Sequence, residues 1–64
     1  MIVAHLVVEG KQPEQREVPD DWLHIAAAGR EPIMIGAVPY RAVNVEHYEI
    51  GGQTHADVTL ERTG

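Results

Sequence analysis

The feature that most restricts the fold of this chain is the absence of cysteine from a sequence of only 64 residues. A domain of this size buries about 60% of the surface that its unfolded chain exposes, so its hydrophobic core is marginal. Small proteins usually compensate with disulfides, a structural metal or oligomerisation. Without cysteine, disulfides and thiolate zinc sites are excluded. Self-association, a histidine or carboxylate metal site, or an unusually efficient core remain for a single domain spanning residues 1–64.

The charge balance is acidic, because ten aspartates and glutamates oppose five lysines and arginines, for a formal net charge of -5 at pH 7. Such a surface repels phosphate backbones, and no cluster of basic residues interrupts it, so nucleic acid is a poor partner. The apolar N-terminal run lacks a preceding cationic region and a following cleavage site, and it is too short to span a bilayer. We therefore expect a cytoplasmic protein without membrane contact.

The first nine residues predict a strand, because β-branched side chains dominate them. Alternation places four aliphatic residues on one face, namely Ile2, Ala4, Leu6 and Val8. The other face carries Val3, His5 and Val7. A strand that is apolar on both faces needs cover on both faces. Two interpretations are open: a central strand beneath the only helix, or a strand whose second face, through Val3, His5 and Val7, forms an oligomer interface.

A short helix is predicted after a polar segment, residues 10–18, that has the composition of a surface loop. Asp20 is a suitable N-cap, and the charge of Asp21 suits the positive end of the helix dipole. The helix is expected over residues 22–28, and Gly29 suits a left-handed C-terminal cap; the alternative is a strand over residues 22–25. The residues expected to face inward are Leu23, Ala26 and Ala27.

The second half of the chain predicts two consecutive hairpins. Residues 33–35 are followed by Gly36-Ala37, and glycine in the first turn position suits a type II′ turn. The chain then continues over residues 38–50, turns at Gly51-Gly52, and returns over residues 53–62. The order β-α-β-β-β predicts a β-dominated α+β fold with one short helix, either a small antiparallel sheet or an SH3-like barrel.

The Gly-Gly turn also predicts the register of its hairpin. One face would pair Val43 with Leu60, Val45 with Val58, and His47 with Ala56. The other face would pair Asn44 with Thr59, Glu46 with Asp57, and Tyr48 with His55. Upstream, the apolar residues Val38 and Tyr40 stand at even positions, whereas the apolar residues Val43 and Val45 stand at odd positions. A bulge or bend near Arg41-Ala42 is therefore expected.

The chain lacks serine as well as cysteine, and it has no glycine-rich phosphate loop. Without the two commonest nucleophiles, a non-catalytic protein without cofactor is the favoured interpretation. The polar face of the last hairpin offers candidate metal ligands, because Glu46 opposes Asp57 with His55 beside them. Two carboxylates and an imidazole suit zinc or manganese; alternatively, solvent and a nearby arginine screen the two charges. His47, on the apolar face, is expected to be a core residue rather than a ligand.

Six residues are candidates for contact with a ligand or a partner. They are Trp22, His24, Arg30, Tyr40, Arg41 and Tyr48. The aromatic and histidine side chains combine a flat apolar body with a polar tip, which suits an exposed contact. The arginines would be required for an anionic ligand, because the rest of the chain is acidic. As the only tryptophan, Trp22 also suits a place in the core.

Three functions remain open from the sequence. The first is a non-catalytic interaction module that self-associates or docks on a protein partner, through the first strand or the bent strand. The second is an oligomeric protein that binds or sequesters a metabolite or nucleotide in a pocket lined by aromatic residues and histidine. The third is a metal-dependent enzyme that uses Glu46, His55 and Asp57.

The stretch from Gly36 to Arg62 resembles small barrel modules of bacteriophage virion proteins. The resemblance lies in Pro39-Tyr40, Val45-Glu46-His47 and the pattern Val58-x-Leu60-Glu61-Arg62. It implies a phage structural or accessory protein as one form that the interaction module would take.

Overall fold

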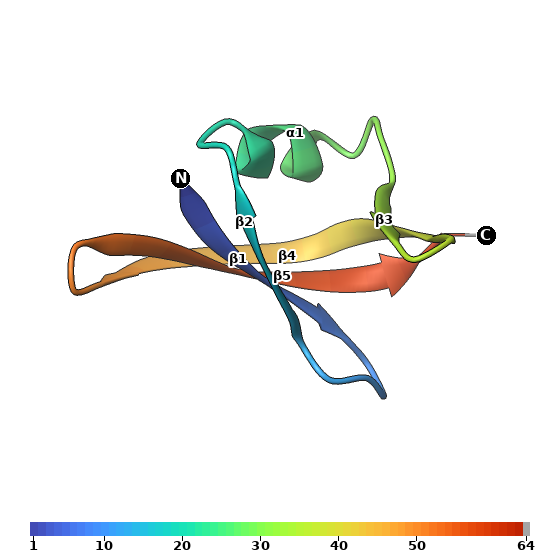
Figure 1. Cartoon of the computed structure of the whole chain (residues 1–64). Helices are drawn as coiled ribbons and strands as arrows, with labels where there is room; N and C mark the ends of the chain where they lie inside the picture. Colours follow the sequence, from blue (N-terminus) through green and yellow to red (C-terminus); the bar gives the residue numbers. More distant parts are fainter. Residues whose placement is uncertain (64) are drawn as a thin grey trace.

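The computed structural model describes residues 1–63 and consists of five strands and one short helix. The elements in chain order are β1 (Ile2–Val8), β2 (Glu14–Val18), α1 (Trp22–Ala28), β3 (Ile33–Ile35), β4 (Val38–Ile50) and β5 (Gln53–Arg62). The strands form one sheet in the spatial order β2-β1-β5-β4-β3. The strand direction turns strongly from β2 to β4, so that the sheet is a curled half-barrel with α1 on one side of it (Figure 1).

The sheet is mixed rather than antiparallel, which corrects the sequence-based prediction. β1 pairs with β5 in parallel, whereas the other neighbouring strands are antiparallel. A parallel pair needs a long crossover, and the chain from β2 to β4 supplies it, a connection that no local pattern predicts. The sheet is also open, with β2 and β3 as its edge strands, so it does not close into an SH3-like barrel.

The predicted loop over residues 10–18 is wrong in its second half, which forms the edge strand β2 antiparallel to β1. The observed order is therefore β-β-α-β-β-β. Only Val18 of β2 is buried, and Glu14 forms an ion pair with Arg16. Charged residues are common on edge strands because they oppose aggregation. They also remove the apolar alternation from which a strand is predicted.

The helix covers the predicted range and ends at Gly29, which adopts a left-handed φ of 69°. The Gly29 N–H donates to the carbonyl oxygen of Ala26 at 3.3 Å. Of the residues predicted to face inward, Ala26 is buried and Leu23 is half-buried, but Ala27 is exposed. A helix of seven residues offers a narrow apolar stripe, because positions three apart share a face. Within residues 1–63 no helix is long and apolar enough to cross a membrane.

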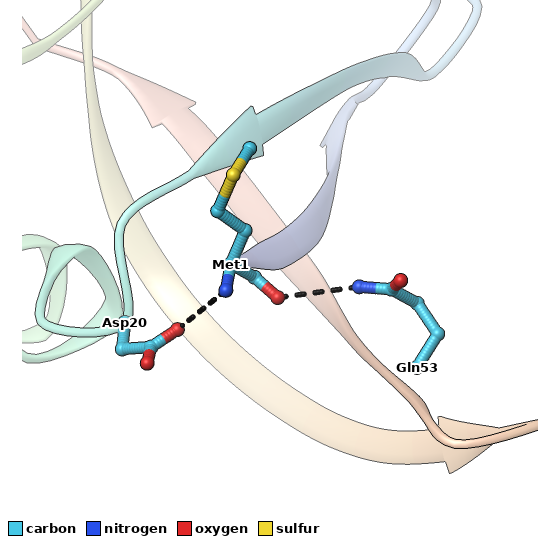
Figure 2. Close-up of polar contacts among 3 residues, drawn as sticks. All are labelled: Met1, Asp20 and Gln53. Carbon is cyan, nitrogen blue, oxygen red and sulfur yellow. Dashed lines mark hydrogen bonds and ion pairs between the residues drawn. The ribbon is translucent and has the colours of Figure 1, made fainter.

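The start of the helix differs from the prediction. Asp21, not Asp20, occupies the N-cap, and the Asp21 side chain makes no capping hydrogen bond. Asp20 Oδ1 instead lies 2.9 Å from the amino nitrogen of Met1. Gln53 Nε2 donates to the carbonyl oxygen of Met1 at 3.2 Å, as Figure 2 shows. These exposed contacts connect the corner between β2 and α1 with the start of β5.

The hydrophobic core lies between α1 and one face of the sheet, here called the core face. Its buried members are Ile2, Ala4, Leu6, Val18, Ala26, Ile33, Tyr40, Ala56, Val58 and Leu60. Leu6 of β1 and Val58 of β5 are the largest fully buried side chains and lie opposite each other in the parallel pair. β1 lies inside the sheet between β2 and β5, as predicted for a central strand.

Both predicted two-residue turns are present. Gly36-Ala37 connects β3 to β4 with a positive φ only at the glycine, the pattern of a type II′ turn. Gly51 and Gly52 connect β4 to β5 with φ values of 58° and 80°, the pattern of a type I′ turn. The register predicted for the second hairpin is confirmed for every residue of β4 from Asn44 to Ile50.

The bulge predicted near residues 41–42 lies at Val43. Ala42 is opposite Leu60, the next pair begins with Asn44, and Val43 is left without a partner. The predicted pairing of Val43 with Leu60 is therefore wrong, and the Val43 side chain is 50% exposed. A hairpin turn determines the strand register close to it. The position of a bulge further along depends on which side chains pack into the core.

The bulge decides the surroundings of the aromatic and histidine residues of β4. Tyr40 lies on the core face at 2% exposure, whereas Tyr48, also at an even position, lies on the opposite face at 38% exposure. That opposite face is here called the open face. His47 is on the core side but is exposed, so the prediction of a core histidine is wrong. The turn end of the β4–β5 hairpin extends beyond α1 (Figure 1).

Candidate functional site

The outer edge of β4 lacks a neighbouring strand over most of its length. β4 is 13 residues long, but β3 pairs only with Val38–Tyr40. Beyond Tyr40, no strand formed by residues 1–63 lies on that side. The side chains from Glu46 to Ile50 are exposed. Figure 1 shows that the turn end of the β4–β5 hairpin, here called the arm, projects beyond α1.

The hairpin register shows which backbone groups face this edge. Ile50 and Gln53 close the two-residue turn, and such a closing pair exchanges both hydrogen bonds. Bonded and non-bonded pairs alternate along an antiparallel ladder, so the N–H and C=O groups of Val45, His47 and Glu49 point away from β5. We call these three residues the free edge. Their outward backbone groups have no hydrogen-bond partner within residues 1–63.

The free edge lacks most of the usual protection of an edge strand, with only the charges of Glu46 and Glu49 to oppose pairing. Natural edges are shortened, charged with lysine, interrupted by proline or bent by a bulge. The stretch from Asn44 to Ile50 has no lysine or proline, and the bulge at Val43 precedes it. The Ile50 side chain is 60% exposed. By contrast, β2, the edge at the other side of the sheet, is short and charged.

Three aromatic rings from three neighbouring strands lie in a row on the open face. His5 Nε2 and His55 Nδ1 are hydrogen-bonded at 3.0 Å, and their rings stack with centroids 5.3 Å apart. The Tyr48 ring stacks on His55 at a centroid distance of 5.6 Å. Because the row runs across β1, β5 and β4, it braces the base of the arm against the rest of the sheet.

Tyr48 is further held by Asp57, whose Oδ1 accepts a hydrogen bond from the tyrosine hydroxyl at 3.0 Å. The pKa of Tyr48 is raised above its ordinary value of 10.0. Partial burial against the sheet is the main cause, and the hydrogen bond to Asp57 and the negative charge of Asp57 act in the same direction. The phenol therefore remains a neutral hydrogen-bond donor.

The three predicted metal ligands do not converge. Glu46 and Asp57 face each other across β4 and β5 as predicted, but Asp57 accepts from Tyr48, and His55 bonds with His5. Within residues 1–63 no group of three or more histidine, cysteine, aspartate or glutamate side chains is placed to hold a metal ion. His55 and Asp57 instead bond to their neighbours on the open face, whereas Glu46 makes no side-chain hydrogen bond within residues 1–63.

Three of the six candidate contact residues gather around α1. His24 and Arg30 line an open cleft of about 450 Å³ at the end of the helix. Trp22 is half-buried against the core and lines a smaller cleft of about 230 Å³ between α1 and β3. Exposed Ile25 lines both clefts, and exposed Met34 lines the smaller one.

The remaining candidates lie elsewhere, so the predicted aromatic pocket does not form within one chain. Tyr40 is buried, and its hydroxyl oxygen accepts a hydrogen bond from Lys11 Nζ at 3.2 Å. Arg41 is exposed and pairs with Glu61 at 3.3 Å. Tyr48 lies on the open face, whereas Tyr40 and Trp22 belong to the core cluster on the other side of the sheet.

The predicted oligomer interface is only partly available in the folded chain. Val3, His5 and Val7 share the open face of β1, but Val3 is 8% exposed and His5 is half-buried beside His55. Both edges of β1 are occupied by β2 and β5. β1 therefore offers a face but no backbone edge to a partner.

The free edge is the feature that sequence reasoning identified only as the bent strand. The signal was present in the strand lengths, because a three-residue strand at 33–35 cannot cover a thirteen-residue strand at 38–50. Which side of the longer strand stays unpaired followed only from the sheet order. Comparison of the chain with models of known protein families, with curated proteins and with solved structures finds no match.

Proposed function

We propose that this chain is a non-catalytic protein-interaction module that binds an extended protein segment by strand addition along the free edge. The observation that carries the proposal is the set of unpaired N–H and C=O groups on Val45, His47 and Glu49. Exposed sheet edges bind extended segments through main-chain hydrogen bonds, and side-chain positions supply specificity.

The surroundings of the free edge support strand addition. Val43 and Ile50, at its two ends, are 50% and 60% exposed and offer apolar contacts to an added strand. The row of rings formed by His5, His55 and Tyr48 holds the base of the arm, so that the edge is ordered before a partner arrives. Preorganisation of this kind lowers the entropic cost of binding.

The test distinguishes the contribution of the His47 backbone to binding from that of its side chain. His47→Pro removes an outward N–H, and proline is tolerated on the unpaired side of an edge strand. His47→Ala loses the same side chain but keeps the N–H. The probe is a neutral extended peptide, acetyl-Thr-Val-Thr-Thr-Val-Thr-Thr-amide, titrated into labelled protein and followed by amide chemical shifts in NMR.

We expect shifts centred on Val45, His47 and Glu49, and about tenfold weaker binding to His47→Pro than to His47→Ala. Circular dichroism and the amide spectrum confirm that both variants are folded. Equal binding by the two variants would show that the backbone edge is not the contact. The proposal would then be wrong.

A further inference from the structure

The added strand would meet an uncompensated negative charge. Glu46 and Asp57 lie directly opposite each other on the open face, and like charges in this arrangement destabilise a sheet. The ion pairs within residues 1–63 involve other carboxylates. The side-chain hydrogen bond to this pair comes from the Tyr48 hydroxyl to Asp57, so within residues 1–63 neither Glu46 nor Asp57 forms an ion pair.

The ladder places this pair next to the free edge. Glu46 bonds to β5 through its backbone, so across the outer edge it forms a non-hydrogen-bonded pair, the kind in which opposite side chains are closest. One residue of an added strand would therefore lie beside the Glu46 carboxylate on the open face. Glu49, three residues further along β4, is exposed on the other face of the same edge.

We infer, on the basis of the proposed function, that the segment added to the free edge is basic. It carries one lysine or arginine opposite Glu46 and a second opposite Glu49. These two residues are three positions apart, and in an extended strand such positions point to opposite faces, as Glu46 and Glu49 do. A small apolar residue next to the second basic residue would lie opposite exposed Ile50.

A second copy of the chain fits this edge less well. Each copy has a net charge of -5, so two copies repel each other. Self-pairing along residues 44–50 would add two glutamates where the edge needs cations, and His47 is the only basic side chain in that segment. The charge of the edge therefore favours a partner of opposite charge.

The test compares three peptides that differ only in charge. The first is acetyl-Thr-Val-Lys-Thr-Val-Lys-Thr-amide; the second has glutamate in place of both lysines, and the third has threonine. Each is titrated into the wild-type chain, Glu46→Gln, and Glu9→Gln, the last being a matched control that removes one exposed charge away from the edge. Amide shifts of the free edge give the dissociation constants, and sedimentation of the chain alone gives its oligomeric state.

We expect the lysine peptide to bind several-fold more tightly than the neutral one, and the glutamate peptide more weakly than either. Glu46→Gln should weaken binding of the lysine peptide about threefold to fivefold, while Glu9→Gln should change it by less than about twofold. Added salt should reduce the preference for lysine.

Two results would overturn the inference but leave strand addition intact. One is that the three peptides bind equally well and that His47→Pro weakens the binding of all three. The other is a dimer of the chain that excludes the peptides and dissociates in His47→Pro, which would assign the edge to a second copy. If no peptide shifts the free-edge amides and the chain is a monomer, both the inference and the proposed function are wrong.

Discussion

At the scale of single residues, the position in the ladder decides what a side chain does. Tyr40 and Tyr48 belong to one strand, yet one is buried in the core and the other stacks on the open face. His47 and His55 are separated by one hairpin turn, yet His47 is exposed and His55 lies between two rings. Neither difference follows from residue type.

The contact between Tyr48 and Asp57 can be tested by titration. Burial and the contact with Asp57 make Tyr48 hold its proton more tightly in the folded state than in the unfolded chain, so their contribution to stability is present below pH 10 and is lost as the pH rises through the raised pKa. In a Tyr40→Phe background, Asp57→Asn should lower the pKa of Tyr48 toward 10.0, measured by tyrosinate absorbance.

Asp21→Asn, which removes an exposed charge at the helix, serves as the control for that titration. It should leave the pKa of Tyr48 unchanged. A pKa that also stays unchanged in Asp57→Asn would show that burial alone is responsible for the shift.

At the scale of elements, the bulge in β4 reconciles two conflicting patterns. Val38–Tyr40 must direct even positions into the core, whereas the arm directs even positions to the open face. One unpaired residue, Val43, makes both possible. The same strand therefore anchors the core at one end and presents the free edge at the other.

Deletion of Val43 should be tolerated, because Ala42 opposite Leu60 and Asn44 opposite Thr59 then become consecutive pairs of a regular ladder, which keeps Tyr40 on the core face. We expect a change of less than about 2 kcal/mol in the free energy of unfolding. Val43→Ala should change it by less than about 1 kcal/mol, because the side chain is 50% exposed. Urea denaturation followed by circular dichroism measures both. A deletion variant that loses about 3 kcal/mol or more would mean that the bend at the bulge is itself required to place Tyr40 in the core.

At the scale of the whole molecule, the small core limits the free energy of unfolding. A chain of 64 residues has a free energy of unfolding on the order of 3–10 kcal/mol. Leu6 and Val58 are its largest fully buried side chains, and they lie where the parallel pair joins the two ends of the chain. Stability therefore depends on a few contacts between residues far apart in the sequence.

Leu6→Ala should remove about 2–5 kcal/mol and leave a large fraction of the chain unfolded. Ile50→Ala, which shortens an aliphatic side chain that is 60% exposed, should change stability by less than about 1 kcal/mol. Thermal unfolding followed by circular dichroism compares the two variants. If Leu6→Ala unfolds at the wild-type temperature, the parallel pair contributes less to the core than its burial indicates.

The sequence by itself determined the features that depend on a few neighbouring residues. Gly29 ended the helix, and Gly51-Gly52 produced the turn and the register of the last hairpin as far as Asn44. These succeed because positive φ values strongly favour glycine, and because a two-residue turn determines which neighbours pair. The lack of serine and cysteine and the acidic charge were likewise readable directly from the residues.

Only the tertiary structure decided which strands meet. β2 is a strand because β1 lies beside it, since its charged residues carry no strand pattern of their own. The parallel β1–β5 pair, the bulge at Val43 and the unpaired side of β4 likewise depend on contacts between distant segments. Local preferences act on a few dihedral angles, whereas strand pairing minimises the free energy of the whole sheet and core. The free edge is what that pairing leaves uncovered.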